Sequence, residues 1–421
     1  MPRNVRPLHP TRLGQAHGGA LCMGLLLAAP VAVASSPKAA QPPTQPVSVR
    51  LEVQQPREVK LVMVGDTGEP LTEAGCDFRP DGSVRLNGGC AASRAQREHI
   101  QAAIRAEGAD AIFALGDLVY PKMPACDGDL DEATVEVLDA SIGSYFSPMG
   151  APTYLVIGNH DAAHLRSRAP QRERCLMAYA AQNPLLRMPA LQYEVDVGFG
   201  KIIVMDSNLR DQSQLPAQLI RTAADNPLAP WTVVLSHHEL RTLADKELDG
   251  FWEPPPAGAW LVEQRLLPDL WVNGHAHSLQ LGVYDARATD DGRVSPSEGD
   301  QPWLIPALTS GAGSKVRPGP SCSDHPASPG GEHQIVADRK ACKEQPARGM
   351  PRFSRSTLGY AVVRLGPWHL QVEIKDHNGE LLYCWVRGKG DPGGATCPLD
   401  GVFEDQPEGG MQGRGAGALG D

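Results

Sequence analysis

The chain has 421 residues, of which 39 are Lys or Arg and 49 are Asp or Glu, so its formal net charge is −10. This acidic balance argues against a nucleic-acid partner or an anionic membrane surface. With 41% hydrophobic and 21% charged residues, the composition is that of a folded globular protein and excludes a mainly disordered chain.

Residues 1–34 predict a secretory signal that is cleaved after Ala34. Residues 1–19 carry three arginines and no acidic residue, 20–34 are apolar, and Ala32-Val33-Ala34 has the small residues of a cleavage site. We therefore expect a periplasmic or secreted protein. Two alternatives stay open: an uncleaved anchor or buried helix, and a lipoprotein attached through Cys22, although Leu21 lacks the small side chain expected before such a cysteine.

Composition divides the rest of the chain into three segments. Residues 35–57 are rich in Pro, Gln and Ser and predict a linker that ends in a short strand around 47–53. Residues 404–421 are rich in Gly and predict a disordered tail. We expect one folded domain over 58–403, with no segment long and apolar enough to cross a membrane.

Five short apolar runs predict buried strands, and each run ends in a polar motif. The runs cover 60–68, 111–120, 153–161, 232–240 and 269–277. Helical patterns at 91–107 and 133–145 separate the first three runs, which indicates an α/β fold. Because ligands of such folds bind at the carboxyl ends of the strands, five side chains are expected to meet there. They are Asp66, Asp117, Asn159, His237 and His275.

Later segments predict antiparallel strands. Residues 192–208 indicate a hairpin around 198–200, and the segment from Thr357 onward indicates two or three strands with a turn at Asn378-Gly379. We expect these strands to form a second, mixed or antiparallel sheet. The interval 283–350 is rich in Gly and Pro and is interpreted as an irregular insertion or a rim of the substrate pocket.

Nine cysteines leave eight once Cys22 is removed with the signal, and an exported protein is expected to pair them as disulfides. Eight cysteines allow 105 pairings, so the sequence alone does not determine the connectivity. Neighbours in the sequence are the favoured pairs, namely Cys76 with Cys90, Cys322 with Cys342, and Cys384 with Cys397.

The polar motifs combine Asp, His, Asn and Tyr, which is a mixed oxygen and nitrogen ligand set that suits Fe, Mn or Zn. Each motif alone has a structural alternative, because Gly-Asp and Asn-Asp pairs serve turns and helix caps and histidines occur on surfaces. All five motifs in order, each after a buried strand, favour a metal centre over coincidence.

The ordered motifs GD-x-G at 65–68, GD-x-x-Y at 116–120, GNHD at 158–161, V-x-x-H at 234–237 and GH-x-H at 274–277 resemble those of the calcineurin-like metallophosphoesterase superfamily. Gly65-Asp66-Thr67-Gly68 and Tyr120 resemble the purple acid phosphatases, especially the small tartrate-resistant type, as does the loop 310–313. The resemblance implies a four-layer α/β/β/α sandwich of two mixed sheets, with the active site at the carboxyl ends of the strands.

The resemblance also implies a centre of two metal ions. Three side chains would bind a ferric ion, with the tyrosine as tyrosinate: Asp66, Tyr120 and His277. Three would bind a divalent Fe, Zn or Mn ion: Asn159, His237 and His275. Asp117 would bridge the two ions, and His160, held by Asp161, would face the substrate. The chain departs from the family at Thr67, where an aromatic residue is frequent, and at His238-Glu239, where Tyr-Pro is frequent.

A dinuclear centre predicts hydrolysis of a small phosphorylated substrate by direct attack of a metal-bound hydroxide, and a ferric ion suits acid pH. Asn159, His160 and His164 are candidate substrate contacts. His160, His164 or His238 would protonate the leaving group. We expect a monomeric acid phosphatase acting on monoesters. The alternatives are a phosphodiesterase or nucleotide pyrophosphatase, and a non-catalytic exported metal-binding protein.

Overall fold

The computed structural model describes part of the chain, all of it within the unit formed by residues 42–421. The described residues are 47–52, 58–78, 89–126, 129–162, 172–208, 231–240, 257–287, 303–319, 322–323, 350–389, 391 and 393–397. The expected signal at 1–34, the tail at 404–421 and most of the linker lie outside these residues, as does His164.

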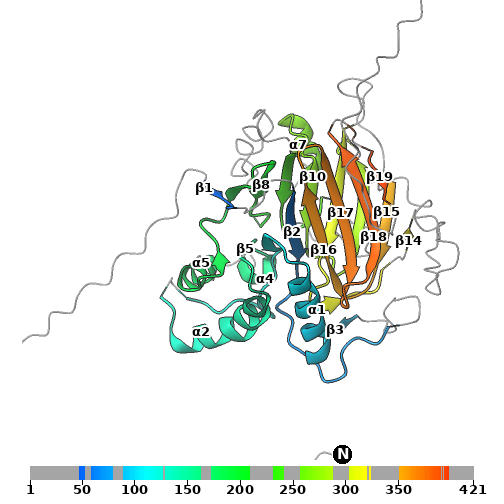
Figure 1. Ribbon diagram of the computed structural model, residues 1–421. Coiled ribbons are helices and arrows are strands. Elements are labelled where there is room, and N and C mark those ends of the chain that lie inside the picture. Colours follow the sequence, from blue (N-terminus) through cyan, green and yellow to red (C-terminus); the bar gives the residue numbers. More distant parts are fainter. Residues whose placement is uncertain are drawn as a thin grey trace, which may run out of the picture. The chain divides into compact units, whose positions relative to one another are not determined.

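One mixed sheet carries the first three predicted strands. Its order is β19 (Ala395–Thr396), β18 (Leu381–Gly388), β17 (His369–Asp376), β16 (Gly359–Leu365), β2 (Val59–Val64), β4 (Ala111–Ala114), β5 (Thr153–Leu155) and β6 (Leu186–Arg187). The strands β2, β4, β5 and β6 are parallel, whereas β16 to β19 are antiparallel and extend the sheet from β2 (Figure 1). The carboxyl ends of β2, β4 and β5 therefore share one edge.

A second mixed sheet carries the other two predicted strands. Its order is β1 (Val47–Arg50), β7 (Tyr193–Asp196), β8 (Gly200–Val204), β9 (Trp231–Leu235), β10 (Leu270–Asn273), β12 (Leu304–Ser310), β11 (Leu279–Asp285), β15 (Met350–Arg355) and β14 (Cys322–Ser323). Strands β8, β9, β10 and β12 are parallel to one another, so their carboxyl ends also share an edge. A short pair, β3 (Cys90–Ala91) with β13 (Lys315–Val316), lies apart from both sheets in the pairing order.

Helices follow the strands as the sequence predicts. The helix α1 (Arg94–Ala106) begins at a capping box in which Ser93 and Gln96 satisfy each other's backbone amides. The segment predicted at 133–145 is helical throughout, as α2 (Glu132–Leu138), a π-helical turn (Asp139–Gly143) and α3 (Ser144–Phe146). The remaining described helices are the 3₁₀ turn Ser147–Met149, α4 (Asn159–Ala162), α5 (Arg172–Gln182) and α7 (Ala257–Glu263).

Alternating side chains divide the nine-stranded sheet into two buried faces. Val233 of β9 belongs to the main hydrophobic core, which also contains residues of the other sheet and Ile100 of α1. The next residue, Val234, belongs to a second cluster with Trp271 of β10 and Trp260 of α7. A period of two along buried strands requires a layer on each face. The arrangement confirms the predicted fold class of helices on two packed mixed sheets.

Two features of the fold differ from the sequence analysis. The hairpin β7–β8 and the strands β16 to β18 do not form a sheet together, because the hairpin joins β9 and the later strands join β2. The interval interpreted as irregular contains β12, a central strand that pairs with both β10 and β11. Pro306 lies within β12, and a proline argues against a central strand because it has no N–H to donate.

Disulfides connect the described segments as predicted at two places, Cys76 with Cys90 and Cys384 with Cys397. Cys126 and Cys175 form a third disulfide. Cys322 is also disulfide-bonded, and its expected partner, Cys342, lies outside the described residues. No helix among the described residues combines the length and the hydropathy needed to cross a bilayer.

Candidate metal centre

The predicted ligands meet where the carboxyl edges of the two sheets come together. Asp66, Asp117 and Asn159 follow β2, β4 and β5 of one sheet, whereas His237 and His275 follow β9 and β10 of the other. The first three lie within hydrogen-bonding distance of histidines from the second sheet. The site is therefore built from both sheets, and neither sheet contains it alone.

The backbone at this edge adopts left-handed conformations that are rare for residues other than glycine. The φ angles are 56° at Asp66, 53° at Asp117, 65° at His275 and 51° at His277. Among the described residues, one other non-glycine residue, Arg265, has a positive φ. Left-handed backbone is uncommon for residues with a Cβ and concentrates at functional sites. The strain at four expected ligands indicates that the fold holds these side chains in imposed positions.

One group of side chains surrounds Tyr120. Its hydroxyl lies 3.1 Å from Asp66 Oδ1 and 3.1 Å from His277 Nε2. His277 Nε2 is in turn 3.0 Å from Asp66 Oδ1, so three donor atoms of different types converge. Asp66 and His277 are buried.

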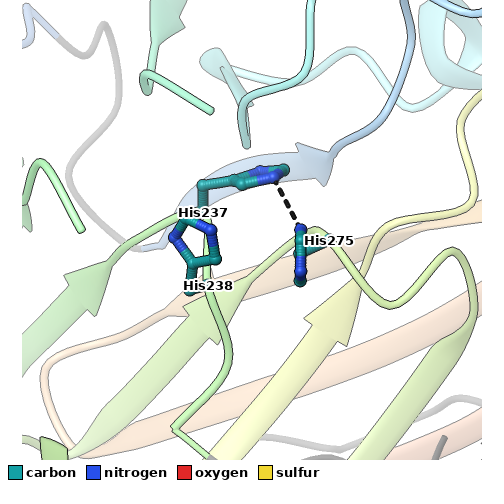
Figure 2. A group of neighbouring side chains, drawn as sticks. All are labelled: His237, His238 and His275. Atoms are coloured by element: carbon teal, nitrogen blue, oxygen red, sulfur yellow. Dashed lines mark hydrogen bonds between the residues drawn. The ribbon is translucent and has the colours of Figure 1, made fainter. Parts of the chain in front are cut away.

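A second group surrounds His237. Its Nε2 lies 3.0 Å from Asn159 Oδ1 and 3.1 Å from His275 Nδ1, and Figure 2 shows the ring reaching toward His275. The other ring nitrogen, Nδ1, lies 2.8 Å from the carbonyl oxygen of Leu115. A hydrogen bond from Nδ1 to this carbonyl would leave the lone pair on Nε2, the atom that faces Asn159 and His275.

Asp117 lies between the two groups. Its Oδ2 is 2.8 Å from the Tyr120 hydroxyl, and its Oδ1 is 3.3 Å from His237 Nε2. Each carboxylate oxygen thus faces one group of donors. This is the arrangement that a carboxylate shared by two cations requires, and the residues fit the dinuclear centre that the sequence predicts.

The electrostatics of the site also favour bound cations. Burial alone would raise the pKa of Asp117, but the neighbouring His237 and His160 outweigh it and lower this pKa. Burial would lower the pKa of His237, yet Asp117 and Asp66 raise it to about 9. Burial and the same two carboxylates raise the pKa of Tyr120 well above its ordinary value. A metal ion would replace protons here, because a cation favours the deprotonated form of each ligand.

Two glycines lie so close to Asp117 and Asp66 that a larger residue would collide with them. A Cβ at Gly158 would lie 2.2 Å from the backbone nitrogen of Asp117, and one at Gly311 would lie 2.7 Å from Asp66 Oδ2. The loop containing Gly311 also holds the Asp66 loop from the other sheet. Gly65 donates its N–H to the Ser310 carbonyl at 2.7 Å, and the Ser314 hydroxyl donates to the Asp66 carbonyl at 2.6 Å. The loop noted at 310–313 therefore positions a ligand.

Asp161 has contacts other than those we expected. Its Oδ1 accepts the N–H groups of Leu118 and Val119, and its Oδ2 accepts the N–H of Gly158. The ring of His160 instead contacts the Pro121 carbonyl oxygen. Adjacent residues of a helix do not face each other, which explains why Asp161 does not hold His160. Asp161 fixes the backbone around Asp117, and burial raises its own pKa to about 7.

The polar residues that follow β8 were not predicted as part of the site. Ser207 is buried against His238, and Asn208 donates to the Asp206 carboxylate at 2.9 Å and to the Gly158 carbonyl at 3.4 Å. Burial raises the pKa of Asp206 to about 6. The signal for these residues was present, because Asp206-Ser207-Asn208 follows a buried strand as the five recognised motifs do. A second overlooked residue, Lys315, lies 4.9 Å from the centre of the Tyr120 ring.

Fold and site together define a class of protein, and a family model agrees. The model of the calcineurin-like phosphoesterases matches residues 59–279, more than half of the chain and the whole span from β2 to His277. The chain belongs to this family. No curated protein has a sequence that matches the chain significantly.

Several solved structures resemble the chain at low sequence identity. The purple acid phosphatase PPD1 from yellow lupin (Lupinus luteus) seeds has 15% identity and a TM-score of 0.50, and the match covers 79% of this chain and 54% of that one. The chain thus spans about half the length of the lupin protein. A dimetal phosphatase from Danio rerio has 12% identity and a TM-score of 0.40, with 79% and 99% covered. GAP50, the anchor in the inner membrane complex of Plasmodium, has 13% identity and a TM-score of 0.43, with 80% and 90% covered.

Proposed function

We propose that the protein is a dinuclear-metal phosphoesterase, and more narrowly an exported acid phosphatase that hydrolyses phosphate monoesters. The observation that carries the proposal is the position of Asp117, whose two carboxylate oxygens face two separate groups of donors. Membership of the calcineurin-like phosphoesterase family supports the reaction class. The low-identity likeness to a purple acid phosphatase supports the fold on which that chemistry would occur.

Seven residues would hold the metal ions in this proposal. Asp66, Tyr120 and His277 would hold the first, ferric iron. Asn159, His237 and His275 would hold the second, a divalent Fe, Zn or Mn ion, and Asp117 would serve both. Two cations at these residues would supply Lewis acidity and activate a water molecule.

The chain's own residues bind and orient the substrate. Asn159 and His160 begin the short helix α4 at the strand edge, next to Asp117, and His160 donates its backbone N–H to Asp117 Oδ1 at 2.9 Å. The His160 ring lies 4.2 Å from the Tyr120 ring and is part-exposed, so it can reach a substrate. We assign protonation of the leaving oxygen to His160. Asp161 positions Asp117, and His164 stays a candidate contact outside the described residues.

The reaction class is tested with two substrates, p-nitrophenyl phosphate and bis(p-nitrophenyl) phosphate. We expect the monoester to be hydrolysed faster, with a maximum rate at acid pH. A faster reaction with the diester would favour the phosphodiesterase alternative. The variant Asp117→Asn keeps the shape of the side chain and should lose hydrolysis of both esters while staying folded. Unchanged hydrolysis in that variant would contradict the assigned centre.

The identity of the first ion is tested by metal content and by the visible spectrum. Tyrosinate bound to ferric iron gives a charge-transfer absorption, and we expect this band in the purified protein and its loss in Tyr120→Phe. The contacts of the Tyr120 hydroxyl with Asp66 and Asp117 support this role. Two zinc ions and a colourless protein would contradict the iron assignment without affecting the reaction class.

Export accords with the disulfides. Three pairs form among the described residues, and disulfides persist in oxidising compartments. The protein in this proposal is a periplasmic or secreted monomer whose signal is cleaved after Ala34. Mass spectrometry of the N-terminus of the exported protein tests the cleavage site, and an intact N-terminus would favour the anchor alternative.

A further inference from the structure

A buried pair, Ser207 and His238, lies beside the second group of donors. His238 directly follows His237, and the centre of its ring is 4.6 Å from that of His275 (Figure 2). One ring nitrogen of His238 lies within 4.8 Å of ligand atoms of His237 and His275. His238 is therefore placed either to bind the second metal ion itself or to face a phosphoryl group held there.

Ser207 makes two contacts with His238. Its Oγ lies 2.8 Å from the ring nitrogen Nδ1 and accepts the backbone N–H of His238 at 3.1 Å. Ser207 follows β8, and His238 follows the neighbouring strand β9, so adjacent strands of one sheet fix the pair. Both residues are buried.

The position of one proton follows from these contacts. A serine hydroxyl has one hydrogen to donate and two lone pairs that accept. The backbone N–H of His238 can only donate, so it uses one lone pair of Ser207. Among the described residues, the Ser207 hydroxyl hydrogen has one acceptor, Nδ1 of His238. A proton on Nδ1 would leave that buried hydroxyl without an acceptor, which folded proteins avoid.

We propose that Ser207 is a positioning residue that keeps the proton of His238 on Nε2, so that His238 donates a hydrogen bond to the substrate phosphoryl group and does not bind metal. Nδ1 is occupied by the serine hydroxyl, and Nε2 carries a hydrogen in place of a lone pair. Neither ring nitrogen is then available as a metal ligand. This inference rests on the proposed phosphoesterase function.

This tautomer gives His238 a role different from that of His160. A neutral imidazole that lost its Nε2 proton would become an imidazolate, so His238 stabilises charge on a phosphoryl oxygen without transferring a proton. Protonation of the leaving oxygen stays with His160. His238 therefore adds a fixed hydrogen-bond donor beside His237 and His275, and not a third imidazole ligand. The sequence suggested His238 as a proton donor to the leaving group, and this inference replaces that role.

The tautomer is measured directly by nitrogen NMR of the zinc-loaded full chain labelled with ¹⁵N-histidine, with His238→Gln identifying the signals. We expect a protonated Nε2 and an unprotonated Nδ1 in the wild type and in Ser207→Thr, which keeps the hydroxyl. Ser207→Ala should give a mixture of tautomers. The matched control is Ser236→Ala, because the Ser236 hydroxyl donates to the backbone carbonyl of His238 and not to its ring. A protonated Nδ1 in the wild type, or an unchanged tautomer in Ser207→Ala, would overturn the proposal.

Zinc content and kinetics test the consequence. His238→Gln keeps a donor near the position of Nε2 and should still bind two zinc ions per chain, whereas a fall to one would identify His238 as a ligand. Ser207→Ala should lower kcat roughly 10-fold to 100-fold, equally for p-nitrophenyl and alkyl phosphates. A loss of kcat restricted to alkyl phosphates would mean that His238 transfers a proton to the leaving group. That result would contradict its role as a neutral hydrogen-bond donor. If the wild type hydrolyses no phosphoester, the proposed function fails, while the NMR and zinc results still decide the tautomer and the ligand.

Discussion

Two regions of the molecule follow opposite rules: the edge that carries the expected metal ligands, called the ligand edge, and the strands β16 to β18. At the ligand edge, four expected ligands have positive φ angles, and acidic and imidazole groups are packed together in the interior. In the described part of β16 to β18, positive φ occurs once, at Gly379 in a turn. The candidate site thus lies where the backbone is strained, whereas the later strands are regularly paired.

Charges are also arranged differently in the two regions. Glu373 of β17 lies 2.5 Å from Arg364 Nε of the neighbouring strand β16 and 3.2 Å from Lys375 Nζ of its own strand, so opposite charges neutralise one another. At the ligand edge, two like charges, those of Asp66 and Asp117, both lie within hydrogen-bonding distance of the Tyr120 hydroxyl. The comparison predicts that changes at the ligand edge affect activity more than stability, and that changes in the later strands do the reverse.

The largest effect is expected for Asp66→Asn. Asparagine tolerates left-handed backbone, so the φ of 56° should persist, but the proposed first metal ion would lose a charged ligand. We expect hydrolysis to fall at least about 1000-fold, which corresponds to about 4 kcal/mol of transition-state stabilisation. Urea unfolding of the metal-free protein should show a change smaller than this loss, because Asn keeps the size of the side chain and removes the repulsion between two carboxylates that contact one tyrosine hydroxyl. Large destabilisation without loss of activity would break the comparison.

Gly158→Ala tests whether the close packing at the ligand edge matters. The new Cβ would meet the Asp117 backbone at 2.2 Å, so Asp117 has to move. We expect a loss of roughly 3–4 kcal/mol in unfolding free energy together with a loss of hydrolysis. Gly150→Ala is the control, because Gly150 has a φ of 73° but open space around it. That variant should lose about 1–2 kcal/mol and keep its activity.

Removing the disulfide between Cys384 and Cys397 probes the later strands. The bond joins β18 to the segment after β19 and closes a loop with a sequence separation of 13. Replacement of both cysteines by serine should lower the unfolding free energy by about 3 kcal/mol, with kcat nearly unchanged. Thermal unfolding and a phosphatase assay on the same sample measure both. A loss of activity in the folded variant would show that the two regions are coupled.

The smallest effect is expected for Glu373→Gln. Burial alone would raise the pKa of Glu373, but Arg364 and Lys375 outweigh it and lower this pKa. A lowered pKa stabilises the fold above the ordinary value of about 4.5 and ceases to do so as pH falls through the folded value. Glu373→Gln should therefore cost about 1–2 kcal/mol at neutral pH and progressively less in acid. A difference that grows on acidification would contradict the sign of this shift.

The sequence predicted which polar side chains lie close together better than it predicted the order of strands in the sheets. The residues at the ends of β2, β4, β5, β9 and β10 were predicted because each polar motif follows a short apolar run, which is local information. Which sheet each strand joins depends on pairings between distant segments, such as β16 with β2, and no local pattern encodes them. The strand β12 is a different case. Pro306 argues locally against a central strand, but the pairing with distant strands outweighs that preference.

The roles of supporting residues were the least predictable. Asp161 accepts three backbone N–H groups, and Ser207 contacts both the ring and the backbone of His238, 31 residues further along the chain. Their residue types also occur in ordinary turns, so the sequence does not distinguish the two uses. Asp161 reaches the Asp117 loop because the short helix α4 begins after β5, which pairs with β4.

The hydrogen bonds between the 310–314 loop and the Asp66 loop imply a thermodynamic link between metal supply and folding. Gly65 and Asp66 extend from one sheet and Ser310 and Ser314 from the other, so the ions would bind across the seam where the sheets join. A ligand that binds only the native state stabilises it by about 4 kcal/mol when present at 1,000 times its dissociation constant. Metal scarcity would then lower the amount of folded protein as well as its turnover, and the abundance of the chain would report on the metal content of its compartment.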